Sequence, residues 1–127
     1  MNKVIPTQNG IVMHQPDGIF NYFGWPSVTR GINDELLAVS SGFRLQHVCP
    51  FGKVALVRSR DEGQTWSPIE VVMDTPLDDR DAGIMAFGDG KLIVTSFNNT
   101  RAFQRSIQNH TPQHKAIVDA YLNLVSD

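Results

Sequence analysis

Residues 59–66 read Ser-Arg-Asp-Glu-Gly-Gln-Thr-Trp and lie between two apolar runs, Val-Ala-Leu-Val at 54–57 and Ile-Glu-Val-Val-Met at 69–73. Two β-rich runs joined by a short polar segment that contains Gly are typical of a β-hairpin. In such a turn, the Asp61 carboxylate can accept hydrogen bonds from the backbone amides that follow it, and the Ser59 hydroxyl can assist. The segment therefore predicts a turn held by its own side chains between two antiparallel strands.

Gly63 and Trp66 complete this turn. Gly63 tolerates the positive φ that a tight turn requires, and Trp66 can fold its apolar ring over the hairpin. The spacing Ser-x-Asp-x-Gly-x-Thr-Trp, which Ser59, Asp61, Gly63, Thr65 and Trp66 fill, resembles the Asp-box of sialidases and related β-propeller proteins. The resemblance implies that these five residues are structural and that the fold is a propeller. It implies no particular activity, because one fold supports many functions.

Length and composition describe a single domain with no strongly charged partner. The 127 residues suit one domain, 1–127, with a hydrophobic core. With 11 basic and 13 acidic residues the net charge is -2, so we do not expect a nucleic-acid partner. Cys49 is the one cysteine, and neither a C-x-x-C motif nor a His cluster predicts a metal, so we expect no metal and no cofactor. No apolar run is long enough for a signal peptide or a membrane span, so we expect a cytoplasmic chain with no membrane partner.

Residues 24–73 are expected to form a first repeating unit. Residues 25–30 and 35–40 predict two strands around the turn at 31–34, and the two strands that flank residues 59–66 follow them. Four antiparallel strands within about fifty residues match the size of one propeller blade.

The pattern restarts at about residue 81. Residues 82–87 and 91–97 predict two more strands, joined by the tight turn Gly-Asp-Gly at 88–90. The segments SVTRGINDELLAVSSGF and GIMAFGDGKLIVTSFNN share the order strand, turn, strand with the same polarity. A second blade therefore begins here.

A helix is expected at about 112–125. Thr111 can cap its first turn, and Pro112 suits the first helical position. Its apolar face is expected to dock against the propeller rim rather than to bind a partner. The resulting fold class is all-β: a partial β-propeller of about one and a half four-stranded antiparallel blades with an Asp-box hairpin, plus a C-terminal helix.

This length cannot close a ring, because a propeller needs ~4–8 blades. We therefore expect an N-terminal fragment of a longer propeller. Assembly of several chains and an Asp-box on a smaller β fold are the alternatives. Exposed blade faces and unpaired strand edges favour self-association.

Strand parity sorts the loops into two ends. Because antiparallel strands alternate in direction, the segments 22–25, 44–51, 77–81 and 98–101 should lie at one end, and the Asp-box turn at the other. The first group is richer in Arg, Asp, His and Asn than the opposite turns. The same end carries the active site in sialidases, so the resemblance implies that a site of this chain lies there too.

Asp79 and Asp81 are the candidate catalytic carboxylates, because either could act as an acid, a base or an acceptor for a sugar hydroxyl. Arg80 between them could bind a carboxylate or keep an aspartate ionised. A solvated turn with internal Asp–Arg hydrogen bonds and an Asx cap is the alternative. Trp25 is expected to pack between blades, with a sugar platform as the alternative. The candidate substrate-binding residues are Arg44, His47, Arg80, Asn98 and Arg101.

The sequence also departs from the sialidase pattern. Gly24 stands where sialidases carry an arginine that grips the substrate carboxylate, and residues 44–50 contain no carboxylate in place of the acid/base aspartate. The resemblance therefore implies part of a carbohydrate-active protein, an exo-acting glycoside hydrolase on a polar or anionic sugar that is not a genuine sialidase. A non-catalytic carbohydrate- or protein-binding propeller is the alternative.

Overall fold

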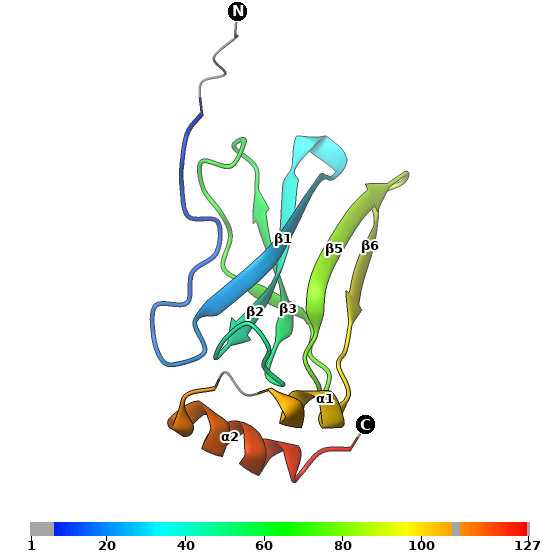
Figure 1. Cartoon of the computed structure of the whole chain (residues 1–127). Coiled ribbons are helices and arrows are strands. Elements are labelled where there is room, and N and C mark those ends of the chain that lie inside the picture. The colour runs from blue at the N-terminus through cyan, green and yellow to red at the C-terminus, as the bar shows by residue number, and fades with distance from the viewer. Residues whose placement is uncertain (1–6, 108–109, 127) are drawn as a thin grey trace, which may run out of the picture.

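The computed structural model describes residues 7–107 and 110–126 (Figure 1). In that part of the chain, six strands form two antiparallel sheets, and two α-helices lie across one end of the sheets. The elements are β1 (Tyr22–Arg30), the 3₁₀ helix η1 (Ile32–Asp34), β2 (Leu36–Arg44), β3 (Lys53–Ser59), β4 (Glu70–Met73), β5 (Arg80–Phe87), β6 (Lys91–Phe97), α1 (Arg101–Ser106) and α2 (Pro112–Leu122).

The prediction of a mostly β chain with a C-terminal helix is confirmed at this level. Strands β1 to β4 form one antiparallel sheet in the order of the sequence, and β5 pairs with β6 in a second sheet. Helix α2 ends at Leu122 rather than near residue 125, and α1 is not among the predicted elements. No helix among the described residues reaches the length and hydropathy that crossing a lipid bilayer requires.

The hairpins β1–β2 and β5–β6 are repeats of each other, residue by residue. Ser27 pairs with Val39 in the first hairpin, and Gly83 pairs with Thr95 in the second. Each residue of the second pair follows its counterpart by 56 residues, and every other shared pair of the two registers keeps the same offset. The internal repeat predicted from the sequence is therefore present in the strand pairing.

The two hairpins also share a β-bulge. The register shifts between Gly24 and Ser27 in β1 and between Arg80 and Gly83 in β5. Trp25 and Asp81 occupy equivalent places in these bulges, with φ of 53° and 49°. A positive φ is uncommon for residues with a side chain, and bulges that re-aim a side chain are often found next to functional sites.

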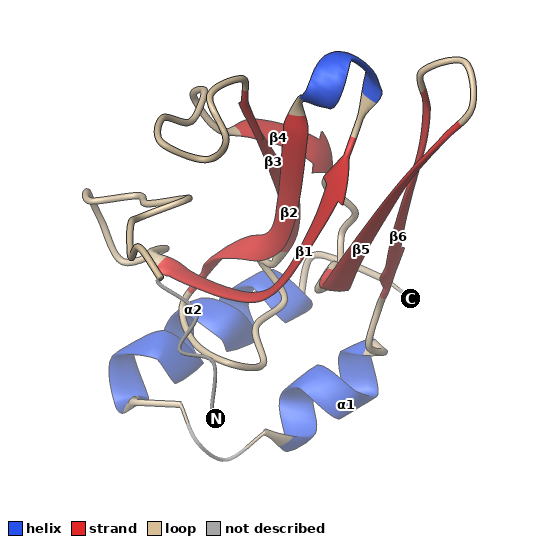
Figure 2. Cartoon of the chain, turned by 90° about the horizontal axis from the view of Figure 1, so that it is seen from above, coloured by secondary structure: helices blue, strands red, loops and turns tan. Residues whose placement is uncertain are grey.

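A hydrophobic core joins the two sheets. Buried Leu37 and Val39 of β2 pack with residues of β3 and with Ala82 and Ile84 of β5. The hydroxyl groups of Ser27 and Thr29 in β1 accept hydrogen bonds from the backbone amides of Ile84 and Ala86, at 3.4 and 3.2 Å. These amides lie on the edge of β5 that β6 does not pair, so β1 covers an edge that would otherwise be exposed (Figure 2).

The Asp-box turn has the predicted hydrogen bonds. The Asp61 carboxylate accepts from the Thr65 backbone amide at 2.9 Å, the Thr65 hydroxyl at 2.5 Å and the Ser59 hydroxyl at 2.8 Å. The Ser59 hydroxyl oxygen accepts from the Gly63 amide at 2.8 Å, and Gly63 has a φ of 83°. The bonds from Thr65 are the main cause that lowers the pKa of Asp61 to about 2. The structural roles of Ser59, Asp61, Gly63 and Thr65 are thus visible in the bonds they make.

Helix α2 docks on the opposite end of the sheets, as Figure 1 shows. The Thr111 hydroxyl accepts from the His114 amide at 3.2 Å, which is the predicted N-cap. Val118 and Leu122 are buried in a second apolar cluster that contains Leu45, Cys49 and Leu77 from the loops. The apolar face of the helix therefore packs on the loops of its own chain.

Candidate functional site

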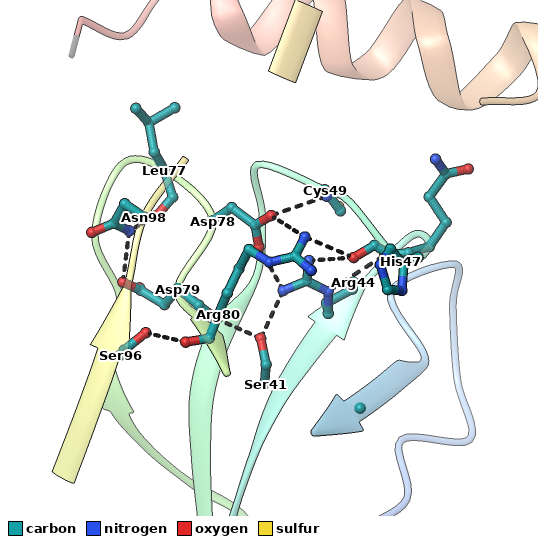
Figure 3. Close-up of polar contacts among 12 residues, drawn as sticks. Ser41, Arg44, His47, Cys49, Leu77, Asp78, Asp79, Arg80, Ser96 and Asn98 are labelled. Atoms are coloured by element: carbon teal, nitrogen blue, oxygen red, sulfur yellow. Dashed lines mark hydrogen bonds and ion pairs between the residues drawn. The ribbon is translucent and has the colours of Figure 1, made fainter. Parts of the chain in front are cut away.

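A buried network of charged side chains lies where β2 ends and β5 begins (Figure 3). Arg44 and Asp78 are both fully buried, and their Nη1 and Oδ1 atoms lie 2.5 Å apart. The same Arg44 nitrogen donates to the Ser41 hydroxyl at 2.7 Å, and Arg80 donates to Asp78 Oδ2 at 3.4 Å. A buried ion pair is tolerated when further hydrogen bonds satisfy its remaining polar atoms. Arg44 and Asp78 Oδ2 make such bonds, whereas Asp78 Oδ1 makes only the ion-pair contact among the described residues.

The indole ring of Trp25 packs against both arginines of the network. The Cζ atoms of Arg44 and Arg80 lie 4.9 and 4.6 Å from the centroid of the ring, which is cation–π distance. The His47 ring lies 4.8 Å from it. Both guanidinium groups also donate to the His47 backbone carbonyl, at 2.8 and 3.2 Å. Trp25 is therefore a packing residue, but its partners are cations rather than only apolar side chains.

Asp79 is enclosed by the chain. Its carboxylate accepts from the Thr75 amide at 2.7 Å, the Thr75 hydroxyl at 2.9 Å and the Asn98 side-chain amide at 3.0 Å. Its backbone amide donates to Gly52, and its carbonyl accepts from Ser41. The side chain is fully buried, so the geometry fits the alternative of an internally capped turn better than a catalytic carboxylate.

Asp81 differs from Asp79 both in burial and in hydrogen bonding. It lies in the β5 bulge, and its side chain is exposed. Within the described residues its carboxylate makes no hydrogen bond and no ion pair. Of the two predicted catalytic carboxylates, Asp81 is the one that solvent and a ligand can reach.

The remaining predicted residues are divided between the network and its surroundings. His47 is exposed beside Trp25. The Asn98 amide donates to Asp79 and to the Leu77 carbonyl, so it braces a loop. Arg101 donates to the Val125 carbonyl at 2.8 Å, next to α2. Arg44, His47 and Arg80 are thus brought together as predicted, whereas the described contact of Arg101 is with the C-terminal segment.

Two network members were not predicted as site residues. Asp78 forms an ion pair with each arginine, and Gln104 of α1 donates to Asp78 Oδ2 at 3.1 Å. Gln104 is buried, and its Oε1 has no hydrogen-bond partner among the described residues. Asp78 stands in the charged run that marked this loop, but a lone glutamine after β6 gives no signal in the sequence.

Cys49 is buried at the rim of the network. Its Sγ accepts from the Leu45 amide at 3.3 Å. Burial raises the pKa of the Cys49 thiol, which keeps the nucleophilic thiolate scarce. In the described part of the chain, no group of three or more His, Cys, Asp and Glu side chains could hold a metal ion.

An open groove of about 470 Å³ adjoins the buried network. Amide and hydroxyl groups are prominent in its lining, which comprises Thr75, Pro76, Leu77, Asn98, Asn99, Thr100 and Ser126. A second groove of about 310 Å³ lies at the Asp-box end, but Arg30 and Arg58 in its wall are already paired with Glu62 and Glu35. In the first groove, Thr75 and Asn98 bond Asp79 and the Thr100 hydroxyl caps α1, so Asn99 and Ser126 are the lining residues without a described side-chain bond.

The predicted separation of the two ends is confirmed by the contacts. Arg80 reaches the His47 carbonyl, and Asp79 is bonded to Gly52 and Asn98, so the four polar segments meet at one end. Glu62 of the Asp-box turn instead pairs with Arg30 at the far end of β1, at 2.7 Å. We call the end where these four segments meet the polar end. Helices α1 and α2 cover much of it (Figure 1).

Comparisons with protein-family models, with curated proteins and with solved structures found no match to this chain.

Proposed function

We propose that this chain is part of a sialidase-superfamily β-propeller and that its polar end takes a polar or anionic sugar. Two features of the chain together carry the proposal. The complete set of Asp-box hydrogen bonds lies at one end of the strands, and the polar loops meet at the opposite end. The repeat of the β1–β2 hairpin after 56 residues supports a blade-like organisation.

The groups at the surface beside the network suit a sugar. The half-buried Trp25 and the exposed His47 offer ring surfaces, and Asp81 offers a carboxylate that is unpaired among the described residues. The adjoining groove offers the amide of Asn99 and the hydroxyl of Thr100. Sugar sites combine such surfaces with a few placed donors and acceptors. The two arginines below Trp25 share one carboxylate partner, Asp78, so one positive charge remains in the network, next to the carboxylates of Asp79 and Asp81.

The position of Arg80 supports the anionic part of this proposal. Gly24 stands in β1 where sialidases carry the carboxylate-gripping arginine, and the equivalent residue of β5, 56 positions later, is Arg80. Arg80 is buried against Trp25 and donates to Asp78. It would therefore act on a ligand through its charge rather than by two direct hydrogen bonds to a carboxylate.

As an exo-acting glycoside hydrolase, the protein would use Asp81 as its acid or base. Asp81 is exposed and unpaired among the described residues, whereas Asp79 is committed to Thr75 and Asn98. Most glycoside hydrolases need two carboxylates. The second group would then come from a part of the site outside this set of loops.

A non-catalytic carbohydrate- or protein-binding propeller is the second candidate. It is favoured by one observation: Arg44, Asp78 and Asp79 are fully buried, and their charged groups contact side chains and backbone groups of the chain itself. Such a network shapes a surface without taking part in chemistry. Binding at the polar end is common to both candidates.

The two tryptophans of the chain allow a direct test, because Trp25 lies at the polar end and Trp66 in the Asp-box. Glucuronic acid and glucose would be titrated into the wild type and into Trp25→Phe and Trp66→Phe variants while tryptophan fluorescence is recorded. We expect a saturable change with the acidic sugar that persists in Trp66→Phe and is lost in Trp25→Phe. No saturable change, or a change that is lost only in Trp66→Phe, would reject sugar binding at the polar end.

A further inference from the structure

The outward surface of the β5–β6 hairpin is apolar and uncovered. Met85 of β5 and Ile93 of β6 are a cross-strand pair and so share this face, with exposed fractions of 54% and 43%. Phe87 and Phe97 lie on the same face by strand alternation and are also exposed. We call the surface formed by Met85, Phe87, Ile93 and Phe97 the outer face.

The internal repeat identifies the surface that fits the outer face. Through the offset of 56 residues, Met85 and Ile93 are the counterparts of Thr29 and Leu37 in the first hairpin. Thr29 and Leu37 face the core, where the opposite side of β5, with Ile84, covers them. The outer face is therefore the second occurrence of a face that, in its first occurrence, is covered by the next repeat.

A matching surface is exposed on the first hairpin. The counterpart of the core residue Ile84 is Val28 of β1, which pairs with Ala38 and is 62% exposed. Ile11 and Val12 of the N-terminal segment are exposed on this side, where they line a groove with the buried Ala38. We call the surface formed by Ile11, Val12 and Val28 the back face.

The two faces lie on opposite sides of the molecule. Figures 1 and 2 show the N-terminal segment on one side of the four-stranded sheet and the β5–β6 hairpin on the other. A contact between the outer face of one copy and the back face of another is heterologous. An assembly of any number of copies therefore ends in one free outer face and one free back face. Groups of exposed apolar side chains that share one face commonly mark protein–protein contacts.

We propose that the outer face binds the back face of a second copy of this chain, head to tail, in continuation of the stacking between its own two hairpins. This inference goes beyond the sugar proposal, because it rests on strand register and exposure alone. The contact is apolar: the hydroxyl groups of Ser27 and Thr29, which bond β5 inside the chain, are replaced by Gly83 and Met85 on the outer face.

The oligomeric state tests this proposal. The weight-average mass of the wild type, measured by sedimentation equilibrium, should rise above the chain mass of 14.1 kDa as concentration increases. Met85→Glu on the outer face and Val28→Glu on the back face should each return the mass to that of one chain. A control variant, Leu124→Glu, changes an 84% exposed residue outside both faces and should associate like the wild type.

A mixture of the two variants separates this contact from any other. Val28→Glu keeps a free outer face and Met85→Glu keeps a free back face, so an equimolar mixture should form a 1:1 complex with twice the chain mass. Circular dichroism melts check that each variant is folded, and Ile93→Glu replaces Met85→Glu if the latter unfolds. A wild type that stays at 14.1 kDa at every concentration, or a mixture that stays monomeric, overturns the proposal and leaves the outer face to a different partner.

Discussion

The guanidinium of Arg44 and the carboxylate of Asp78 form a fully buried ion pair, with 2.5 Å between Nη1 and Oδ1. The pair links the end of β2 to the loop before β5, and Gln104 joins it from α1. It therefore connects the four-stranded sheet, the β5–β6 hairpin and the helical segment. Arg44 and Asp78 lie in the segments where strand direction predicts a ligand site, and they also hold these elements together.

Removal of Asp78 should strongly destabilise the protein. An Asp78→Ala change leaves the Arg44 charge buried without its partner, and the free energy of unfolding should fall by about 3–5 kcal/mol. Replacement of both partners, Arg44→Met with Asp78→Leu, should cost clearly less than the single change. Urea unfolding of the wild type and of these two variants measures this difference. Equal losses in the single and the double variant would contradict an energetically coupled pair.

Asp79 and Asp81 should respond to substitution in opposite ways. Asp79→Ala leaves the Thr75 backbone amide without its described acceptor, removes the bond from Asn98, and should lower the free energy of unfolding by about 1–3 kcal/mol. Asp81→Asn removes no hydrogen bond or ion pair among the described residues, and asparagine tolerates the positive φ of this bulge, so its effect should stay within about 0.5 kcal/mol. Sugar affinity should fall in Asp81→Asn. Equal stability of the two variants would show that Asp79 is not a structural residue.

Asp61 should make stability depend on pH in the acid range. Its folded-state pKa is lowered from 3.8 to about 2, so its contribution is present above pH 3.8 and is lost as the pH falls towards 2. Asp61→Ala should lower the denaturation midpoint at neutral pH, and the difference from the wild type should shrink between pH 4 and 2. Asp17→Ala, at an exposed position, is the control. A difference that stays constant with pH would remove Asp61 from this role.

The chain should not cleave a sialic-acid substrate. Under the proposed relationship to sialidases, Gly24 stands where an arginine is expected to grip the substrate carboxylate, and Arg80 at the equivalent place in β5 is buried. Purified protein incubated with a fluorogenic sialoside should release no product above the blank. Product release that is lost in Asp81→Asn would contradict this prediction and would make the chain an active sialidase.

The local parts of this structure could be predicted from the sequence. The Asp-box turn is specified by five positions within eight residues, because its hydrogen bonds join Asp61 and Ser59 to groups at most four positions away. The gathering of Arg44, His47 and Arg80 followed from strand direction alone. Alternating patterns and turn residues also predicted the six strands, to within a few residues at their ends.

The long-range parts could not be predicted. Asp78, Asp79 and Asp81 are alike in sequence, and their burial depends on Thr75, Asn98 and Gln104, which reach them only in the folded chain. The positive φ of Trp25 and Asp81 arises from bulges that no turn residue announces. These tertiary contacts decide which carboxylate is structural and which is free.

The central claim, that the polar end binds a sugar, is tested most directly by two-dimensional ¹H–¹⁵N NMR of the chain during titration with glucuronic acid. The two tryptophan indole N–H groups report on the two ends. We predict saturable shifts of the Trp25 indole and of the His47 and Asp81 amides, with the Trp66 indole unchanged. A spectrum in which only Trp66 and its neighbours shift, or in which nothing shifts with any acidic sugar, would contradict the claim.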